Sequence, residues 1–220
     1  MVKKPKRSEA ASRSKRNQRN KKIKKRENPL GVNFSSRQAK ENATQVIISA
    51  GLLKIFGVGT LILGDSGIGK SESSLELISR GHKFISDDVV EIFRDKDGRL
   101  HGRAPRLTRN FMEIRGLGII NIKEIFGSKS ILDETQIDLV IRLKKWNKKM
   151  EIDRLGLEVP EDYVLAGTRI PQLHIPVAPG RNIATLIEVA SRVFLLRQKG
   201  YLAAQDITRR LDKKLAGKNE

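Results

Sequence analysis

Short apolar stretches separated by glycines and polar residues predict several β-strands from residue 44 onward. Residues 44–64 are rich in β-branched and other apolar side chains, which predicts two short strands joined by a turn at Gly57–Gly59. Residues 82–95 predict a strand, an acidic pair and a second strand, and Asp97-Gly98 predicts the turn of a hairpin. Further strands are expected in residues 137–143 and 172–177.

Apolar residues at helical spacing predict three helices. Residues 70–81 place apolar side chains near one face, and Gly81 suits the C-terminal cap. Residues 183–200 hold the longest pattern, with an apolar face of Ile183, Leu186, Ile187, Ala190, Phe194 and Leu195. A last helix is expected in residues 201–217. Residues 111–127 are expected to combine a glycine-rich loop with a short helix, and residues 147–170 to be irregular.

This order of elements predicts an α/β fold, with a mixed sheet flanked by helices in one domain spanning residues 44–215. Hydrophobic residues make up 38% of the chain, which is enough for a packed core. The absence of cysteine excludes disulfides and thiolate metal sites, and it fits a reducing, cytoplasmic compartment. No apolar run approaches the roughly 18–20 residues of a membrane span, so we expect no membrane segment.

Positive charge gathers at the beginning of the sequence. The formal net charge is +19, and residues 1–28 hold 13 Lys and Arg against two Glu. Because apolar side chains there are few and not periodic, we expect residues 1–43 to form a disordered basic tail. The tail could contact nucleic acid or acidic surfaces weakly, or it could only increase solubility. The lack of interleaved aromatic residues favours the second interpretation.

A phosphate-binding motif lies between a predicted strand and a predicted helix. The stretch from Gly64 to Ser71 matches the Walker A pattern G-x-x-x-x-G-K-[ST]. Its residues are Gly64, Asp65, Ser66, Gly67, Ile68, Gly69, Lys70 and Ser71. Glycines let backbone N–H groups turn toward phosphate oxygens, Lys70 would reach the β- and γ-phosphates, and the Ser71 hydroxyl would ligate Mg²⁺. The motif therefore predicts nucleotide binding.

Two pairs of charged residues are candidates for catalytic or metal-binding roles beside this loop. Asp87 and Asp88 follow a predicted strand, and only 16 residues separate Lys70 from Asp87. A carboxylate this close could serve as a base or a metal partner, although such a pair is also typical of a solvated turn. Glu113 and Arg115 lie two residues apart and would face the same way in an extended segment. They suit metal binding and phosphate neutralisation, or a simple surface ion pair.

Other polar and aromatic residues carry weaker signals. Arg154 and Arg181 each lie in a loop beside glycine or proline, and their spacing alone decides little. The three histidines have no metal-ligand spacing, and a capping role is the simplest interpretation of His82. Trp146 and Phe126 are expected in the core.

Several motifs, taken in order, resemble the catalytic domain of the HPr kinase/phosphorylase family. They are GDSGIGKSE, RGHKFISDD, EIRGLGIINIKEIFG, DRLG and IPVAPGRNIATLIEVA, and the resemblance covers about residues 44–205. The resemblance implies a bacterial enzyme that uses ATP and Mg²⁺ to phosphorylate a serine of HPr, the phosphocarrier of the sugar phosphotransferase system. It also implies removal of that phosphate by phosphorolysis, with phosphate as acceptor and pyrophosphate as product. The expected fold is phosphoenolpyruvate carboxykinase-like, and the expected assembly is a homo-hexamer.

The resemblance assigns a role to each motif. It implies that Gly64–Ser71 holds the nucleotide phosphates, that Lys70 is essential for transfer and that Ser71 ligates Mg²⁺. It implies that Asp87 accepts the serine proton in phosphorylation and donates a proton in the reverse reaction. Glu113 would be a second metal contact.

The resemblance also turns the isolated arginines into candidates. Glu113 and Arg115 fall within residues 112–121, a segment that would serve both reactions. Arg154 would lie in the active site, and residues 176–181, with Arg181, would form a loop weighted toward dephosphorylation.

The sequence departs from the family pattern in two ways. Family members usually carry an N-terminal domain, where a short basic segment stands in this sequence. The family also places a histidine upstream of the loop, to orient the catalytic aspartate, and here Ser49 stands at that position with Ala50 beside it. We therefore expect slower chemistry, with a weakly catalytic or non-catalytic nucleotide-binding regulator as one alternative. A nucleic-acid-associated protein that uses its tail is another.

Overall fold

The computed structural model describes residues 46–147 and 160–216. The chain divides into two units, Met1–Asn42 and Ala43–Glu220, and all described residues belong to the second unit. The predicted tail, residues 1–43, and the candidate Arg154 lie outside the described residues. In the part of the chain that is described, no helix combines the length and hydrophobicity needed to cross a membrane.

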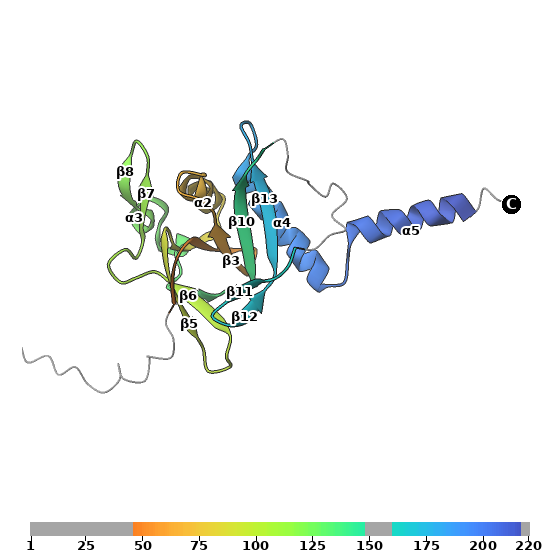
Figure 1. The fold of residues 1–220 in the computed structure, drawn as a ribbon. Coiled ribbons are helices and arrows are strands. Elements are labelled where there is room, and N and C mark those ends of the chain that lie inside the picture. The colour runs from red at the N-terminus through yellow and green to blue at the C-terminus, as the bar shows by residue number, and fades with distance from the viewer. Residues whose placement is uncertain (1–45, 148–159, 217–220) are drawn as a thin grey trace, which may run out of the picture. The chain divides into compact units, whose positions relative to one another are not determined.

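A mixed five-stranded sheet forms the centre of the second unit (Figure 1). Its strands, in spatial order, are β13 (Gln172–Val177), β10 (Leu139–Lys145), β3 (Val58–Leu63), β2 (Gly51–Ile55) and β4 (Lys83–Ser86). β10 runs parallel to both β3 and β13, whereas β2 runs antiparallel to β3 and β4. The predicted mixed sheet is therefore present.

Additional antiparallel sheets surround this centre. A four-stranded sheet has the order β1 (Val46–Ser49), β5 (Val89–Arg94), β6 (Leu100–Arg103) and β9 (Glu134–Gln136). Two hairpins complete the described strands: β7 (Phe111–Ile114) with β8 (Gly118–Asn121), and β11 (Tyr163–Leu165) with β12 (Thr168–Ile170). The fold thus has more sheets than the one that the sequence pattern predicts.

The helices of the described residues are α2 (Lys70–Ser79), α3 (Ile122–Phe126), α4 (Ile183–Gln198) and α5 (Ala203–Ala216), with a short 3₁₀ turn, η2 (Ser128–Ser130). Of these helices, α2, α3 and α4 contribute side chains to the core on one face of the central sheet, whereas α5 has no buried residue and extends away from it (Figure 1). α2 lies between the β7–β8 hairpin and α4 and contacts both of them (Figure 1). The helix that carries the end of the phosphate-binding motif is therefore packed between two elements that come later in the chain.

Alternating side chains of the central strands build a separate core on each face of the sheet. Leu53 and Ile62 pack with Leu77 of α2 and Ile187 of α4 on the helical face. The neighbouring Leu52 and Leu61 point the other way and pack against Val90 and Ile92 of the four-stranded sheet. This is the period of two expected of a strand covered on both faces. The predicted apolar face of residues 183–200 packs on the helical core, as expected.

Several local expectations are wrong in detail. Residues 46–63 form three strands instead of two, because the chain passes from the four-stranded to the five-stranded sheet at Ala50, whose N–H donates to the carbonyl of Asp88. The turn between β2 and β3 uses Phe56 and Gly57, both with positive φ, and Gly59 lies within β3. Positive φ at both positions matches the twist of a two-residue hairpin.

Pairing between segments accounts for the remaining differences. The expected glycine-rich loop in residues 111–121 is the β7–β8 hairpin, and residues 163–170 form another hairpin. The strands of these two hairpins have only three or four residues each. Segments this short show no clear alternation of apolar and polar residues, so the sequence pattern did not predict them. Phe126 packs partly buried against the core, but Trp146 is 43% exposed and is not a core residue.

Candidate active site

The phosphate-binding loop connects the end of β3 to the first turn of α2. Lys70 begins α2 and is largely buried, and its Nζ donates to the carbonyl oxygens of Gly64 (2.7 Å) and Asp65 (3.1 Å). The ammonium group therefore folds back over its own loop. Gly69 caps α2 with φ of 102° and has no side chain to occupy the first N–H groups of the helix. Those donors and Lys70 form a ready anion-binding site.

A buried carboxylate lies against this loop at the end of β4. Asp87 is 8% exposed, and the Ser71 hydroxyl donates to its Oδ1 at 3.2 Å. Burial raises the pKa of Asp87 to about 6, the Ser71 hydrogen bond and Lys70 oppose the rise, and the charge of Asp88 adds to it. A carboxyl group with a pKa near neutrality can exchange a proton in either direction.

Asp88 is held in an unusual conformation beside Asp87. Its φ is 65°, in the left-handed region that costs a non-glycine residue about 1–2 kcal/mol. Two contacts from the β1–β2 connection hold it there: Ser49 Oγ donates to Asp88 Oδ1 at 3.1 Å, and Ala50 N donates to Asp88 O at 3.1 Å. The Ser49 hydroxyl therefore contacts Asp88, and the hydroxyl on Asp87 comes from Ser71.

The β7–β8 hairpin supplies one acidic and one basic side chain to the same pocket. Glu113 lies in β7 and Arg115 in the turn that follows it, and both line the pocket formed by the loop and Asp87. The segment is therefore not extended through Arg115, as the spacing argument assumes, but the two side chains still reach one pocket. Arg115 lies close over the loop, because a Cβ built on Gly67 would meet its guanidinium at 3.0 Å. The hairpin therefore brings a cation directly above the anion-binding loop.

The structure brings together most of the residues predicted for the site, but not all. The pocket is lined by Ser66, Gly67, Gly69, Lys70, Ser71, Glu72, Asp87, Asp88, Glu113 and Arg115. Arg181 is not among these residues, and its Nη1 donates to the carbonyl of Pro176 at 2.8 Å. The sequence pattern pointed to Asp88 only as a member of the acidic pair with Asp87, and it did not point to Glu72. For Glu72 the available signal was its place in the first turn of α2, which points toward the loop.

The oxygen atoms in this pocket suit Mg²⁺. Within residues 46–147 and 160–216, no group of three or more His, Asp or Glu could hold an ion by itself. The hydroxyl of Ser71 and the carboxylates of Asp87 and Glu113 nevertheless share one pocket. Mg²⁺ commonly takes only one or two protein ligands and completes its shell with water and nucleotide phosphates. The donor set therefore fits Mg²⁺ bound together with a nucleotide.

The HPr Serine kinase C-terminal domain family matches residues 40–211 of this chain. The chain belongs to this family. It is similar to the HPr kinase/phosphorylase of Thermoanaerobacter sp. (strain X514), with 45% identity over 174 residues that cover 79% of this chain and 56% of the relative. The relative from Lachnoclostridium phytofermentans is 45% identical over 181 residues, covering 82% of this chain and 58% of the relative.

A solved structure of a family member has the same fold. The structure of the Hpr(Ser) kinase/phosphatase from Coxiella burnetii is similar with a TM-score of 0.66 and 32% identity. The similarity covers 74% of this chain and 98% of that chain. The chain spans a little more than half the length of the curated relatives it matches. The membership of the family therefore rests on the domain that contains the pocket.

Proposed function

We propose that this family member is an ATP- and Mg²⁺-dependent kinase/phosphorylase that acts on a serine of HPr, a phosphocarrier protein. The observation that carries the proposal is the placement of the buried Asp87 in one pocket with the phosphate-binding loop and Lys70. The relatives named HPr kinase/phosphorylase support the choice of substrate. A protein serine presented at the open side of the pocket would meet a base and a phosphoryl donor together.

In the forward reaction, Asp87 accepts the proton of the serine hydroxyl. The serine oxygen forms a bond to the γ-phosphorus, the bond from that phosphorus to the bridging oxygen breaks, and ADP leaves with the electron pair. Lys70 binds the β- and γ-phosphates and Arg115 neutralises charge above the loop. Because the pKa of Asp87 is raised to about 6, its carboxylate is ionised at neutral pH while still able to hold a proton.

In the reverse reaction, an oxygen of inorganic phosphate attacks the phosphorus of phosphoserine. The bond between that phosphorus and the seryl oxygen breaks, and Asp87 returns a proton to the seryl oxygen. The products are serine and pyrophosphate, so the same carboxyl group serves as base in one direction and as acid in the other.

Mg²⁺ bound here would screen phosphate charge, and Ser71 and Glu113 are its proposed protein ligands. Arg181 is proposed to act in dephosphorylation from the loop that precedes α4, next to α2. Arg154 is also a proposed active-site residue, although it lies outside the described residues.

Phosphoryl transfer to purified HPr tests this proposal. The full chain, incubated with HPr, labelled ATP and Mg²⁺, should transfer label to a serine, and phosphate should then release pyrophosphate. Lys70→Ala should abolish both reactions. Lys96→Ala, in an exposed hairpin turn, is the matched control and should leave them unchanged. No transfer by the intact chain, or equal transfer by Lys70→Ala, would refute the proposal.

A second candidate is a nucleotide-binding regulator with weak or no catalysis. The observation that favours it is the Ser49–Asp88 contact, because Ser49 stands where the family has a histidine and its hydroxyl donates to Asp88. In that case ATP would bind normally, turnover would be very slow, and Ser49→His would raise it. Rapid turnover that is insensitive to Ser49→His would exclude this candidate. A homo-hexamer and weak binding of nucleic acid by the tail stay predictions.

A further inference from the structure

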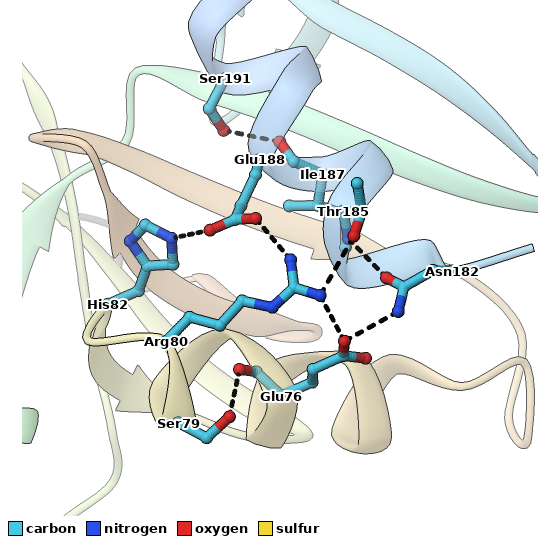
Figure 2. A network of polar contacts seen from close by, with 9 residues as sticks. All are labelled: Glu76, Ser79, Arg80, His82, Asn182, Thr185, Ile187, Glu188 and Ser191. Carbon is cyan, nitrogen blue, oxygen red and sulfur yellow. Dashed lines mark hydrogen bonds and ion pairs between the residues drawn. The ribbon is translucent and has the colours of Figure 1, made fainter.

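A network of polar side chains joins α2 to α4 (Figure 2). The members on the α2 side are Glu76, Arg80 and His82, and those on the α4 side are Asn182, Thr185 and Glu188. Glu188 accepts hydrogen bonds from Arg80 and His82 near the end of α2. These contacts hold the two helices together at that end.

Asn182 makes the connection at the other end of the network. Its Oδ1 accepts from the backbone N–H of Thr185 at 2.7 Å, which caps the N-terminus of α4. Its Nδ2 donates to Glu76 Oε1 at 2.8 Å. The atom of Asn182 that accepts from the Thr185 N–H must be the side-chain oxygen. The other atom is therefore the NH₂ group, which donates to Glu76. One side chain therefore both begins α4 and binds it to α2.

The residue before Asn182 is Arg181, so this connection lies at the end of the arginine's loop. Arg181 Nη1 donates to the carbonyl of Pro176 at 2.8 Å, and its backbone N–H donates to Ala178. These bonds close the loop on itself. Glu76 is six residues beyond Lys70 in α2, which corresponds to about 9 Å along a helix. The closed loop is thus bound to the helix that begins at the phosphate site.

We infer that Asn182 is a positioning residue, whose amide binds the Arg181 loop to Glu76 and so sets where Arg181 lies relative to the bound phosphates. The inference rests on the proposed function, because it assigns Arg181 to the transfer reactions. The Arg80–Glu188 and His82–Glu188 contacts already join the helices near the end of α2. Loss of the Asn182–Glu76 bond should therefore move the loop without separating the helices.

A variant that keeps the cap but removes the donor tests this role. In Asn182→Asp the carboxylate still accepts from Thr185 N–H, and Asp is a good N-cap residue, but it repels Glu76. We expect kcat for phosphorolysis to fall by about 10- to 100-fold, with a smaller change in the KM for HPr. The melting temperature should stay within a few degrees of wild type because the cap is retained.

The reversed pair supplies the decisive comparison. In Asn182→Asp with Glu76→Gln, the new amide donates to the new carboxylate, so the bond returns with its polarity exchanged. Because Glu76 Oε1 also accepts from Arg80, Glu76→Gln alone, which loses that ion pair, is the reference for the double variant. This double variant should recover most of the lost kcat. Gln136→Glu removes a similar amide donor, to Asp138, in the four-stranded sheet, and it should leave kcat unchanged.

Amide hydrogen exchange gives a readout that does not depend on activity. Residues 176–182 should exchange faster in Asn182→Asp and return to the wild-type rate in the double variant. Wild-type rates in Asn182→Asp, for both kcat and exchange, would overturn the inference, as would failure of the double variant to recover either. If the wild-type chain shows no turnover at all, the proposed function fails, and the exchange measurement still decides whether Asn182 anchors the loop.

Discussion

The hydroxyl of Ser71, the last residue of the phosphate-binding motif, donates a hydrogen bond of 3.2 Å to Asp87 Oδ1. A serine hydroxyl has one donor and two lone pairs, so it can make this bond and still ligate a metal ion. The contact ties the proposed base directly to the loop that would hold the phosphates. Movement of the loop would therefore change the hydrogen bond to Asp87 and the position of its carboxylate.

Replacing the buried carboxylate should stabilise the protein while it abolishes transfer. The pKa of Asp87 is raised from 3.8 to about 6 in the folded state, mainly by burial. A raised pKa means that the folded state prefers the neutral form, so stability is lost as pH rises through about 6. Asp87→Asn should therefore gain about 1–3 kcal/mol of unfolding free energy above that pH.

Denaturant unfolding at several pH values checks this expectation. The gain should disappear below about pH 4, where the carboxyl group is protonated in both states. Asp97→Asn, at an exposed turn, is the control and should show no such gain. An Asp87→Asn protein that is less stable than wild type above pH 6 would contradict the raised pKa.

The two reaction directions should depend on pH in opposite ways. Phosphorylation needs ionised Asp87, so its rate should fall about tenfold per pH unit below about 6. Phosphorolysis needs a proton on Asp87, so its rate should decline as pH rises above the same value. Initial rates of both reactions between about pH 5 and about pH 8 measure this. Parallel profiles would show that Asp87 does not serve both directions.

Gly67→Ala should weaken the binding of ATP, because the added methyl group would crowd Arg115 at the loop. A Cβ at this position would lie 3.0 Å from the guanidinium of Arg115, and φ is +75°. We expect the affinity for ATP to fall by about 10- to 100-fold, because displacing Arg115 or the loop by about 1 Å disturbs the phosphate site. Isothermal titration with ATP and Mg²⁺ measures the change.

Gly98→Ala separates crowding from backbone strain. Gly98 has a similar φ of +77°, but a Cβ there meets nothing within 4 Å. Both variants should lose about 1 kcal/mol of stability through the left-handed conformation. Only Gly67→Ala should bind ATP more weakly, and equal affinities would argue against a role for the Arg115–loop contact.

The hydroxyl of Ser49 should contribute modestly to the rate by holding the Asp88 carboxylate. Ser49→Ala removes the 3.1 Å bond to Asp88 Oδ1 but leaves the backbone bond from Ala50 N to Asp88 O. We expect kcat for phosphorylation to fall about three- to tenfold, which corresponds to one exposed hydrogen bond. Ser49→Thr retains the hydroxyl and should stay near wild type, whereas equal losses in both variants would point to packing instead.

Local patterns predicted the features that form within a single continuous stretch of the sequence. The Walker A spacing located the loop, and the apolar face of residues 183–200 located α4 and its contact with the core. The short separation of Glu113 and Arg115 also placed them in one pocket, although Arg115 lies in the hairpin turn and not in a strand. These features follow from backbone periodicity and from the conformations that glycine permits, both of which act between near neighbours.

Contacts between distant segments could not be predicted in the same way. The packing of β7 on α2 brings Arg115 over Gly67, and the pairing of β1 with β5 brings Ser49 to Asp88. Nothing in the sequence near Asn182 indicates Glu76 as its partner. Each of these pairs depends on how sheets and helices stack.

The sequence by itself therefore determined that a phosphate-binding loop begins a helix and that acidic and basic residues follow it. Only the tertiary structure decided which carboxylate lies against Ser71, which one Ser49 holds and where Arg181 is anchored. The physical reason is that a local motif sets backbone conformation over a few residues. Burial, which raises the pKa of Asp87, arises only when segments far apart in the chain exclude water together.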